Sequence, residues 1–262
     1  RRWSGCRDPS MDMCRRPILQ GTGSARSDAA LIAGTGMDLP DVAWIKGAIF
    51  DQDGLLFDTE VLFERAWRKV GAEFGVKVPD ALPYACCGCG RKELPDVIRR
   101  FLPDIDVDAY IERALNMAFS AQAESVPTLK PGVRKMLAKC RENGIRTAVA
   151  SSSLRSLVEH NLRSSGLLGM FDAIVTGEDV VHGKPAPDIF LLAASRIDVP
   201  PPRCLVFEDA FTGIRAAHAA GCNPVLIPDR IQPTPEILGI CSCFKSLDAA
   251  ADSIFAERCA RS

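Results

Sequence analysis

The chain has 262 residues, 47% of them hydrophobic, and its 32 basic side chains nearly balance its 33 acidic ones. This length supports one large domain, or a large domain with a smaller companion, around a sizeable core. The balanced charge excludes a strong positive field, so we expect neither nucleic acid nor a membrane surface as a partner. No apolar run reaches the roughly 18 residues that span a bilayer and no secretory signal opens the chain, which favours a cytoplasmic protein acting on small molecules.

Residues 1–42 differ in composition from the rest of the chain. They contain six arginines but no lysine or glutamate, they are rich in Gly, Ser and Pro, and they sustain no apolar period. Such a composition buries too little apolar surface to fold, so we predict a disordered N-terminal segment. A fragment boundary, an expression remnant and an organelle-targeting leader are all open as its origin, although its aspartates count against a leader.

The first predicted strand, Ile45–Phe50, ends in carboxylates. Asp51 and Asp53 follow it in the string DQDGLLFDT, which spans residues 51–59. A short apolar run of this kind is typical of a strand that is covered on both faces. Since Asp-Gly alone is an ordinary turn former, the aspartates indicate a site only if other charged residues join them.

About eighty residues separate this strand from the next helix-strand unit, which is too long for a loop. Four apolar side chains in this stretch follow the i, i+4, i+7, i+11 spacing of an amphipathic helix, namely Phe63, Trp67, Val70 and Phe74. A second such helix is expected near 107–123. The predicted domains are a helical cap at 60–126 and a core made of 43–59 and 127–262, with hinges near 58–59 and 127–132.

Eleven cysteines are scattered along the chain, and several lie in apolar segments, where a free thiol acts as a small hydrophobe. We interpret them as reduced. The run from Cys86 to Cys89 contains a C-x-x-C spacing, but a zinc site would need a second pair of ligands, and the three histidines are far apart in sequence. A metal or redox role for this cluster is therefore the less favoured interpretation.

The remaining strands and helices alternate along the chain. The predicted strands are Arg146–Ala150, Ala173–Thr176, Cys204–Phe207 and Pro224–Ile227. The predicted helices are Gly132–Glu142, Leu154–Ser165 after a serine cap, Pro187–Arg196, and Thr212–Ala220 from a threonine cap. Repeated strand-helix units predict an α/β fold with a doubly wound parallel sheet. Its ligand crevice should lie at the carboxyl ends of the strands.

Hydroxyl and charged side chains fall at or near the ends of these later strands. They are Ser151, Lys184, Glu208 and Asp209. Because the carboxyl ends of parallel strands share one edge of a sheet, these groups and Asp51 should converge. Carboxylates gathered in one crevice repel each other and resist ionising, so a divalent cation and a lysine are the natural compensation. The sequence therefore predicts a Mg²⁺ site built for phosphate.

Four motifs together resemble those of the haloacid dehalogenase superfamily. They are the DQDGLLFDT string, the Ser151-Ser152-Ser153 turn, the segment GKPAPDIF at 183–190, and FEDA at 207–210 followed by Thr212-Gly213, spread over residues 45–250. The chain is most similar to the branch with a helical cap after the first strand. That branch contains sugar-phosphate, pseudouridine-monophosphate and glycerol-phosphate phosphatases and β-phosphoglucomutases, so the resemblance implies a Rossmann-like core with an inserted cap.

The resemblance also implies roles for the acidic residues. Asp51 is then the nucleophile that takes the phosphoryl group as an aspartyl-phosphate, while Asp53 protonates the leaving alcohol and later activates water. The implied metal ligands are Asp51, the backbone carbonyl of Asp53, Asp209, and Glu208 directly or through water. Mg²⁺ is the implied cofactor.

Other positions concern the phosphate and the substrate. Ser151 and Ser152 are expected to bind phosphate at a helix start, and Lys184 to place a positive charge on its oxygens. Arg91, in the place of the family's cap loop that dips toward the site, is a candidate substrate contact, with an ordinary surface arginine as the alternative. Gln52 stands where similar sequences carry a bulky apolar residue, and we expect altered packing from it and no loss of chemistry.

The predicted function is Mg²⁺-dependent hydrolysis of a small phosphorylated metabolite, a sugar, polyol or nucleoside phosphate, by a monomer. A β-phosphoglucomutase-like phosphomutase is one alternative, which Phe63 disfavours because a mutase of this branch has a histidine there. A second alternative is a binding protein without catalysis on the same fold. Because the core motifs do not contact the leaving group, they leave the identity of the alcohol open.

Overall fold

The computed structural model describes residues 33–87, 89, 91, 93–230 and 232–256. Residues 1–32, the larger part of the segment expected to be disordered, lie outside the described residues. Within the described ranges, no helix has both the length and the apolar character needed to cross a bilayer.

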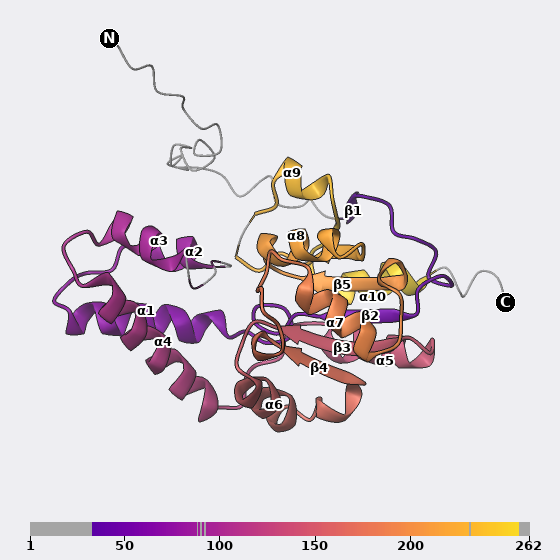
Figure 1. The fold of residues 1–262 in the computed structure, drawn as a ribbon, viewed down its shortest axis with the longest axis horizontal. Coiled ribbons are helices and arrows are strands. Elements are labelled where there is room, and N and C mark those ends of the chain that lie inside the picture. The colour runs from indigo at the N-terminus through magenta and orange to yellow at the C-terminus, as the bar shows by residue number, and fades with distance from the viewer. Residues whose placement is uncertain (1–32, 88, 90, 92, 231, 257–262) are drawn as a thin grey trace, which may run out of the picture. The chain divides into compact units, whose positions relative to one another are not determined.

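A seven-stranded sheet with the order β1-β7-β6-β5-β2-β3-β4 forms the core (Figure 1). Its strands are β1 (Ala33–Gly36), β2 (Gly47–Phe50), β3 (Arg146–Ser151), β4 (Ala173–Thr176), β5 (Cys204–Glu208), β6 (Asn223–Leu226) and β7 (Ser242–Phe244). All neighbouring pairs among β2 to β7 are parallel, and β1 pairs antiparallel with β7. The doubly wound parallel sheet predicted from sequence is confirmed.

Helices cover both faces of the sheet because alternate strand residues point to opposite sides. On the central strand β2, Phe50 belongs to one apolar cluster and Ile49 to another. The first cluster includes side chains of α5 (Val133–Glu142), α6 (Arg155–Ser164) and α10 (Leu247–Phe255). The second includes side chains of α7 (Asp188–Arg196) and α8 (Phe211–Ala219). The strands are therefore buried on both sides, as their unbroken apolar runs predicted.

Two strands were not predicted. Strand β7 is three residues long, too short to show a pattern, and β1 lies inside the segment 1–42 that we expected to be disordered throughout. At Gly36 the backbone approaches β7 so closely that a Cβ atom would lie 2.1 Å from the carbonyl oxygen of Cys241. Small residues thus allow β1 to pair at the sheet edge, which corrects the expectation for residues 33–36.

Two predicted helix caps are also wrong. Helix α6 has Leu154 as its N-cap, with no capping side chain, because the Ser153 hydroxyl is engaged elsewhere. Helix α8 begins one residue before Thr212, after the N-cap Ala210, so Thr212 lies inside the first turn. Both errors concern segments next to the carboxyl ends of strands, where side chains face the crevice predicted there.

A helical insertion separates β2 from α5. It comprises α1 (Glu60–Glu73), α2 (Ala81–Cys86), α3 (Leu94–Phe101) and α4 (Val107–Ala123). These helices share an apolar cluster of their own, in which the buried Tyr110 hydroxyl donates to the backbone oxygen of Trp67 at 2.8 Å. We refer to α1–α4 as the cap.

The two segments that connect the cap to the core run side by side. The backbone N–H of Asp58 donates to Thr128 O, and that of Lys130 donates to Leu56 O, both at 2.9 Å. The predicted hinges therefore contact each other, although their movement stays a prediction.

Candidate active site

The loop after β2 folds tightly against the end of β5. Gly54 has a φ of 82°, and a Cβ atom on it would lie 2.2 Å from Oδ2 of Asp209. Only glycine combines this backbone conformation with so close an approach. The Asp-Gly pair, an ordinary turn signal in the sequence, here brings Asp51 and Asp209 to one place.

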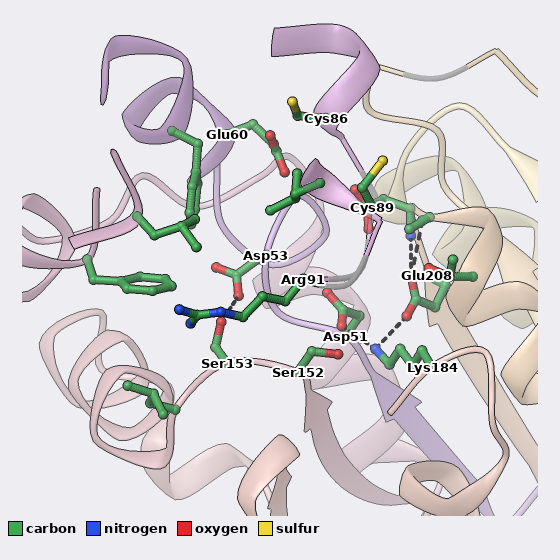
Figure 2. A pocket seen from close by; sticks show the side chains of 18 of the residues that line it. Asp51, Asp53, Glu60, Cys86, Cys89, Arg91, Ser152, Ser153, Lys184 and Glu208 are labelled. Atoms are coloured by element: carbon green, nitrogen blue, oxygen red, sulfur yellow. Dashed lines mark hydrogen bonds and ion pairs between the residues drawn. The ribbon is translucent and has the colours of Figure 1, made fainter. Parts of the chain in front are cut away.

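Lys184 lies at the centre of the buried charges (Figure 2). Its Nζ donates to Asp51 Oδ1 at 2.5 Å, to Glu208 Oε1 at 2.6 Å and to the backbone oxygen of Ala150 at 3.1 Å. Burial alone would lower the pKa of Lys184, but the charges of Asp51 and Glu208 outweigh it and raise that pKa above its ordinary value. The lysine is therefore a fixed positive charge.

Glu208 is held on both oxygens. Oε1 accepts from Lys184, and Oε2 accepts from the backbone N–H groups of Asp209 and Ala210, each at 3.1 Å. The carboxylate also fills the space beside Gly213, where a Cβ atom would lie 1.9 Å from Oε1. This arrangement suits Glu208 to anchoring Lys184, and it leaves few lone pairs for a metal ion.

The acidic groups fit a divalent cation. Asp51, Glu208 and Asp209 each offer a carboxylate oxygen, and these oxygens lie within 4.8 Å of one another. Burial and the neighbouring carboxylates raise the pKa of Asp209, and burial raises that of Asp51 to about 8 against the pull of Lys184. Among the described residues, no basic side chain pairs with Asp209. A hard cation held by carboxylate oxygens would offset this repulsion, as Mg²⁺ does.

Asp53 lies beside this cluster and accepts three side-chain hydrogen bonds. Its Oδ1 accepts from Thr59 Oγ1 at 2.9 Å and from Gln122 Nε2 at 3.4 Å, and its Oδ2 accepts from Ser153 Oγ at 2.7 Å. The core, the hinge and the cap each contribute one donor. The geometry can therefore fix both oxygens of this carboxylate.

The serine turn after β3 is arranged differently from the expectation. Ser151 is 1% exposed, and its Oγ accepts the backbone N–H of Ser153 at 3.1 Å. Ser152 and Ser153 line the cavity, whereas Ser151 does not. A phosphate in the cavity would thus face Ser152 and Ser153, with Ser151 shaping the turn from behind.

Apart from Ser151, the predicted site residues line one cavity of about 390 Å³ (Figure 2). Its core side carries Asp51, Asp53, Lys184 and Asp209. Its cap side is mostly apolar, and the lining residues there are Glu60, Phe63, Trp67, Cys86, Cys89, Arg91, Leu94, Leu115 and Phe119. Arg91 is exposed and lines the cavity, and its contact with the substrate stays a prediction.

A family model described as a haloacid dehalogenase-like hydrolase matches residues 45–221. The chain belongs to this hydrolase family. Fructose-1-phosphate phosphatase YqaB of Escherichia coli (strain K12) is 37% identical over 180 residues, which are 68% of this chain and 94% of that protein. The chloroplastic protein SUPPRESSOR OF QUENCHING 1 of Arabidopsis thaliana is 35% identical over 219 residues, but this chain spans only 19% of its length.

Solved structures give the same result for this hydrolase. The crystal structure of β-phosphoglucomutase from Clostridium difficile matches with a TM-score of 0.64 and 25% identity, covering 83% of this chain and 100% of that one. The resemblance to sugar-phosphate phosphatases and phosphoglucomutase-like proteins is thus confirmed. The hydrolase is an enzyme of the phosphatase class.

Three residues around Asp53 were not singled out from the sequence of the hydrolase. Thr59 and Ser153 stand inside the motifs, but the motifs do not predict that their hydroxyls donate to Asp53, and the serine before Leu154 is expected to cap a helix instead. Gln122 lies in an amphipathic helix with no motif around it. Gln122 is 69 positions from Asp53 in the sequence, and only the folded structure shows that the two side chains lie side by side.

The cysteine cluster also borders the cavity. Cys87 donates its thiol to Glu60 Oε2 at 3.3 Å, and burial raises the pKa of Cys86 to about 12, which keeps this thiol protonated. Burial likewise raises the pKa of Glu60. Within the described residues, no cysteine joins a set of three metal-ligating side chains. Cys86 and Cys89 thus form part of the cap-side lining of the cavity.

Proposed function

We propose that this hydrolase removes phosphate from a small phosphate monoester through an aspartyl-phosphate on Asp51. The observation that carries the proposal is the position of the Asp51 carboxylate, which lines the cavity next to Lys184 and next to Asp209, a carboxylate that pairs with no basic side chain among the described residues. The relative named for fructose 1-phosphate supports a sugar phosphate as the substrate class.

The reaction has two balanced steps. In the first, an Asp51 carboxylate oxygen forms a bond to phosphorus, the bond from phosphorus to the alcohol oxygen breaks, and protonated Asp53 gives its proton to that oxygen. In the second, Asp53 takes a proton from water, the water oxygen bonds to phosphorus, and the bond to Asp51 breaks. Inorganic phosphate leaves, and both aspartates return to their starting states.

The surrounding groups hold the phosphate. Lys184 places its charge beside Asp51, where the transferring oxygens must lie, and Ser152 and Ser153 face the same space. Asp51 and Asp209, with the backbone carbonyl of Asp53 and Glu208 as further candidates, would hold Mg²⁺. The bound ion would supply charge that neutralises the phosphate oxygens and the carboxylates together.

The cap side of the cavity favours hydrolysis over phosphoryl transfer within a sugar. A mutase must keep a phosphorylated product bound and needs cationic groups for a second phosphate. Among the described residues that line the cap side, Arg91 is the one cation, and Phe63 and Phe119 pack edge to face there with ring centroids 5.7 Å apart. The binding-protein alternative gains no support, since both aspartates of the proposed chemistry face the cavity.

A phosphate-release assay tests the proposal. The unaltered protein with Mg²⁺ should release phosphate from members of a panel of hexose, pentose, polyol and nucleoside phosphates, and Asp51→Asn should lower release by at least about a thousandfold. Interconversion of sugar phosphates with little release would identify the mutase instead. Equal release by the two proteins would leave the binding protein as the better account.

The cellular setting and the assembly state stay predictions. No disulfide bond joins two of the eight described cysteines, which supports the reducing, cytoplasmic setting expected from composition. We propose that the protein is a monomer.

A further inference from the structure

One polar side chain of the cap is buried against the candidate site. Gln122, in the last turn of α4, is 1% exposed, and its Nε2 lies 3.4 Å from Asp53 Oδ1. Its Oε1 is buried without a hydrogen-bond partner among the described residues. Burying an amide costs free energy that an apolar side chain of equal size would not. Packing alone therefore does not account for a glutamine at this position.

The amide is oriented by chemistry and by its surroundings. With Oε1 toward Asp53, two acceptor oxygens would face each other, so Nε2 is the atom that meets the carboxylate. The end of α4 is tied to the core nearby, because His160 Nε2 on α6 lies 3.0 Å from the backbone oxygen of Ser125. The segment that follows Gln122 is thus held by the core.

The three donors do not act equally on the two oxygens of Asp53. Oδ1 accepts from both Thr59 and Gln122, whereas Oδ2 accepts only from Ser153, a hydroxyl that can rotate and accept instead. Gln122 is the donor that the cap supplies, and it acts on the same carboxylate oxygen, Oδ1, as Thr59 of the hinge.

We propose that Gln122 is a positioning residue that fixes the orientation of the Asp53 carboxyl group in the cavity. The inference rests on the proposed function. Proton transfer to the alcohol then depends on the cap, because α4 supplies the donor that fixes the carboxyl group. The role concerns the first step, in which the bond from phosphorus to the alcohol oxygen breaks.

Leaving groups of different basicity test this role. The value of kcat/KM includes leaving-group departure, and an aliphatic alkoxide needs a proton whereas p-nitrophenolate leaves without one. We expect Gln122→Met, which keeps the length and loses the donor, to lower kcat/KM by about tenfold for the sugar or polyol phosphate that the unaltered protein cleaves fastest. For p-nitrophenyl phosphate the change should stay within about twofold.

Two further variants separate positioning from damage to the cap. Tyr110→Phe removes a buried cap hydroxyl that does not reach Asp53, so it should change kcat/KM for both substrates by the same factor. Gln122→Asn, one methylene shorter, should restore part of the loss on the aliphatic substrate if the donor matters. Release of p-nitrophenol by each variant also reports that it is folded.

The outcomes are distinguishable. A Gln122→Met protein that loses activity equally on both substrates, or that loses none, contradicts the positioning role while the proposed function stands. An unaltered protein that cleaves no monoester contradicts the proposed function and this inference with it. The role is supported if Gln122→Met lowers kcat/KM selectively for the aliphatic ester while Tyr110→Phe shows no difference between the two substrates.

Discussion

Gly54 joins the two acidic motifs of the hydrolase at the level of a single residue. Its backbone has a positive φ and lies against the Asp209 carboxylate, so the loop that carries Asp51 and Asp53 can approach β5. A side chain at this position would push the two motifs apart. The proposed metal site therefore depends on Gly54 having no side chain.

Gly54→Ala should destabilise the protein and impair metal binding more than left-handed strain alone explains. Strain at a positive φ costs about 1–2 kcal/mol, and here the new Cβ would also displace Asp209. Gly75→Ala is the matched control, because Gly75 has a φ of 72° with nothing within 4 Å of an added Cβ. Urea unfolding and Mg²⁺-dependent phosphate release measure the two effects.

We expect both variants to lose stability, but only Gly54→Ala to lose activity, by about tenfold or more. Equal activity in the two variants would mean that the loop tolerates the displacement of Asp209, and the close contact between Gly54 and Asp209 would then not matter for catalysis.

Residue types and spacing predicted much of the candidate site, because a carboxylate at a strand end has few structural reasons to be there. Asp51, Asp53, Lys184, Glu208 and Asp209 all converge. The second layer around them was not predictable. Sequence patterns do not show that Glu208 accepts from Lys184 and from two backbone N–H groups, or that the Ser151 hydroxyl accepts from the backbone N–H of Ser153. Those facts depend on distances that only tertiary packing sets.

Among the secondary structure elements, predictability followed the strength of the local pattern. Strands buried on both faces and long amphipathic helices such as α1 and α4 carry strong patterns and were predicted. Short elements such as β7 and α9 (Pro235–Leu238) contain too few residues for any period. The helix starts near Ser153 and Thr212 were misjudged because a serine or threonine hydroxyl next to a site can serve the site instead of the helix.

An ion pair links the cap helix α1 to the core loop after β6. Arg230 donates to Glu64 Oε2 at 2.8 Å, and Arg68 on α1 itself pairs with Oε1 of the same carboxylate at 3.1 Å. The hydrogen bonds from Arg230 and then Arg68 hold the pKa of Glu64 below its ordinary value. The ion pair between Arg230 and Glu64 therefore stabilises the packing of the cap against the core.

Glu64→Gln should lower the free energy of unfolding at neutral pH by up to about 1 kcal/mol, a modest amount because the pair is partly exposed. A depressed carboxyl pKa contributes stability above the ordinary pKa near 4.5, and that contribution is lost as the pH falls through the depressed value. The difference between Glu64→Gln and the unaltered protein should therefore shrink toward zero in acid.

Thermal unfolding across this pH range measures the effect of Glu64→Gln. Glu112→Gln, on the exposed face of α4, serves as the control, since no ion pair of Glu112 occurs among the described residues. A stability difference that persists unchanged below the pKa of Glu64 would show that the charge of this carboxylate is not what ties the cap to the core.

At the scale of the whole molecule, the sheet edge concentrates negative charge that folding alone does not compensate. Three carboxylates meet there, and Lys184 pairs with two of them. A ligand that binds the native state and not the unfolded chain stabilises folding by an amount set by its concentration relative to Kd. The proposed metal site therefore predicts a change in global stability as well as in activity.

Mg²⁺ should raise the midpoint of thermal unfolding, and chelation should abolish phosphate release reversibly. At a Mg²⁺ concentration of about 100 times Kd, the added free energy of unfolding is about 2.7 kcal/mol. Asp209→Asn removes a proposed ligand and relieves the repulsion among the carboxylates, so this variant should be at least as stable as the unaltered protein without metal and should gain much less when Mg²⁺ is added.

NaCl at equal ionic strength controls for screening, and Glu112→Gln controls for the loss of a carboxylate elsewhere. If Asp209→Asn gains as much from Mg²⁺ as the unaltered protein does, the ion binds at another place and the proposed ligand set is wrong.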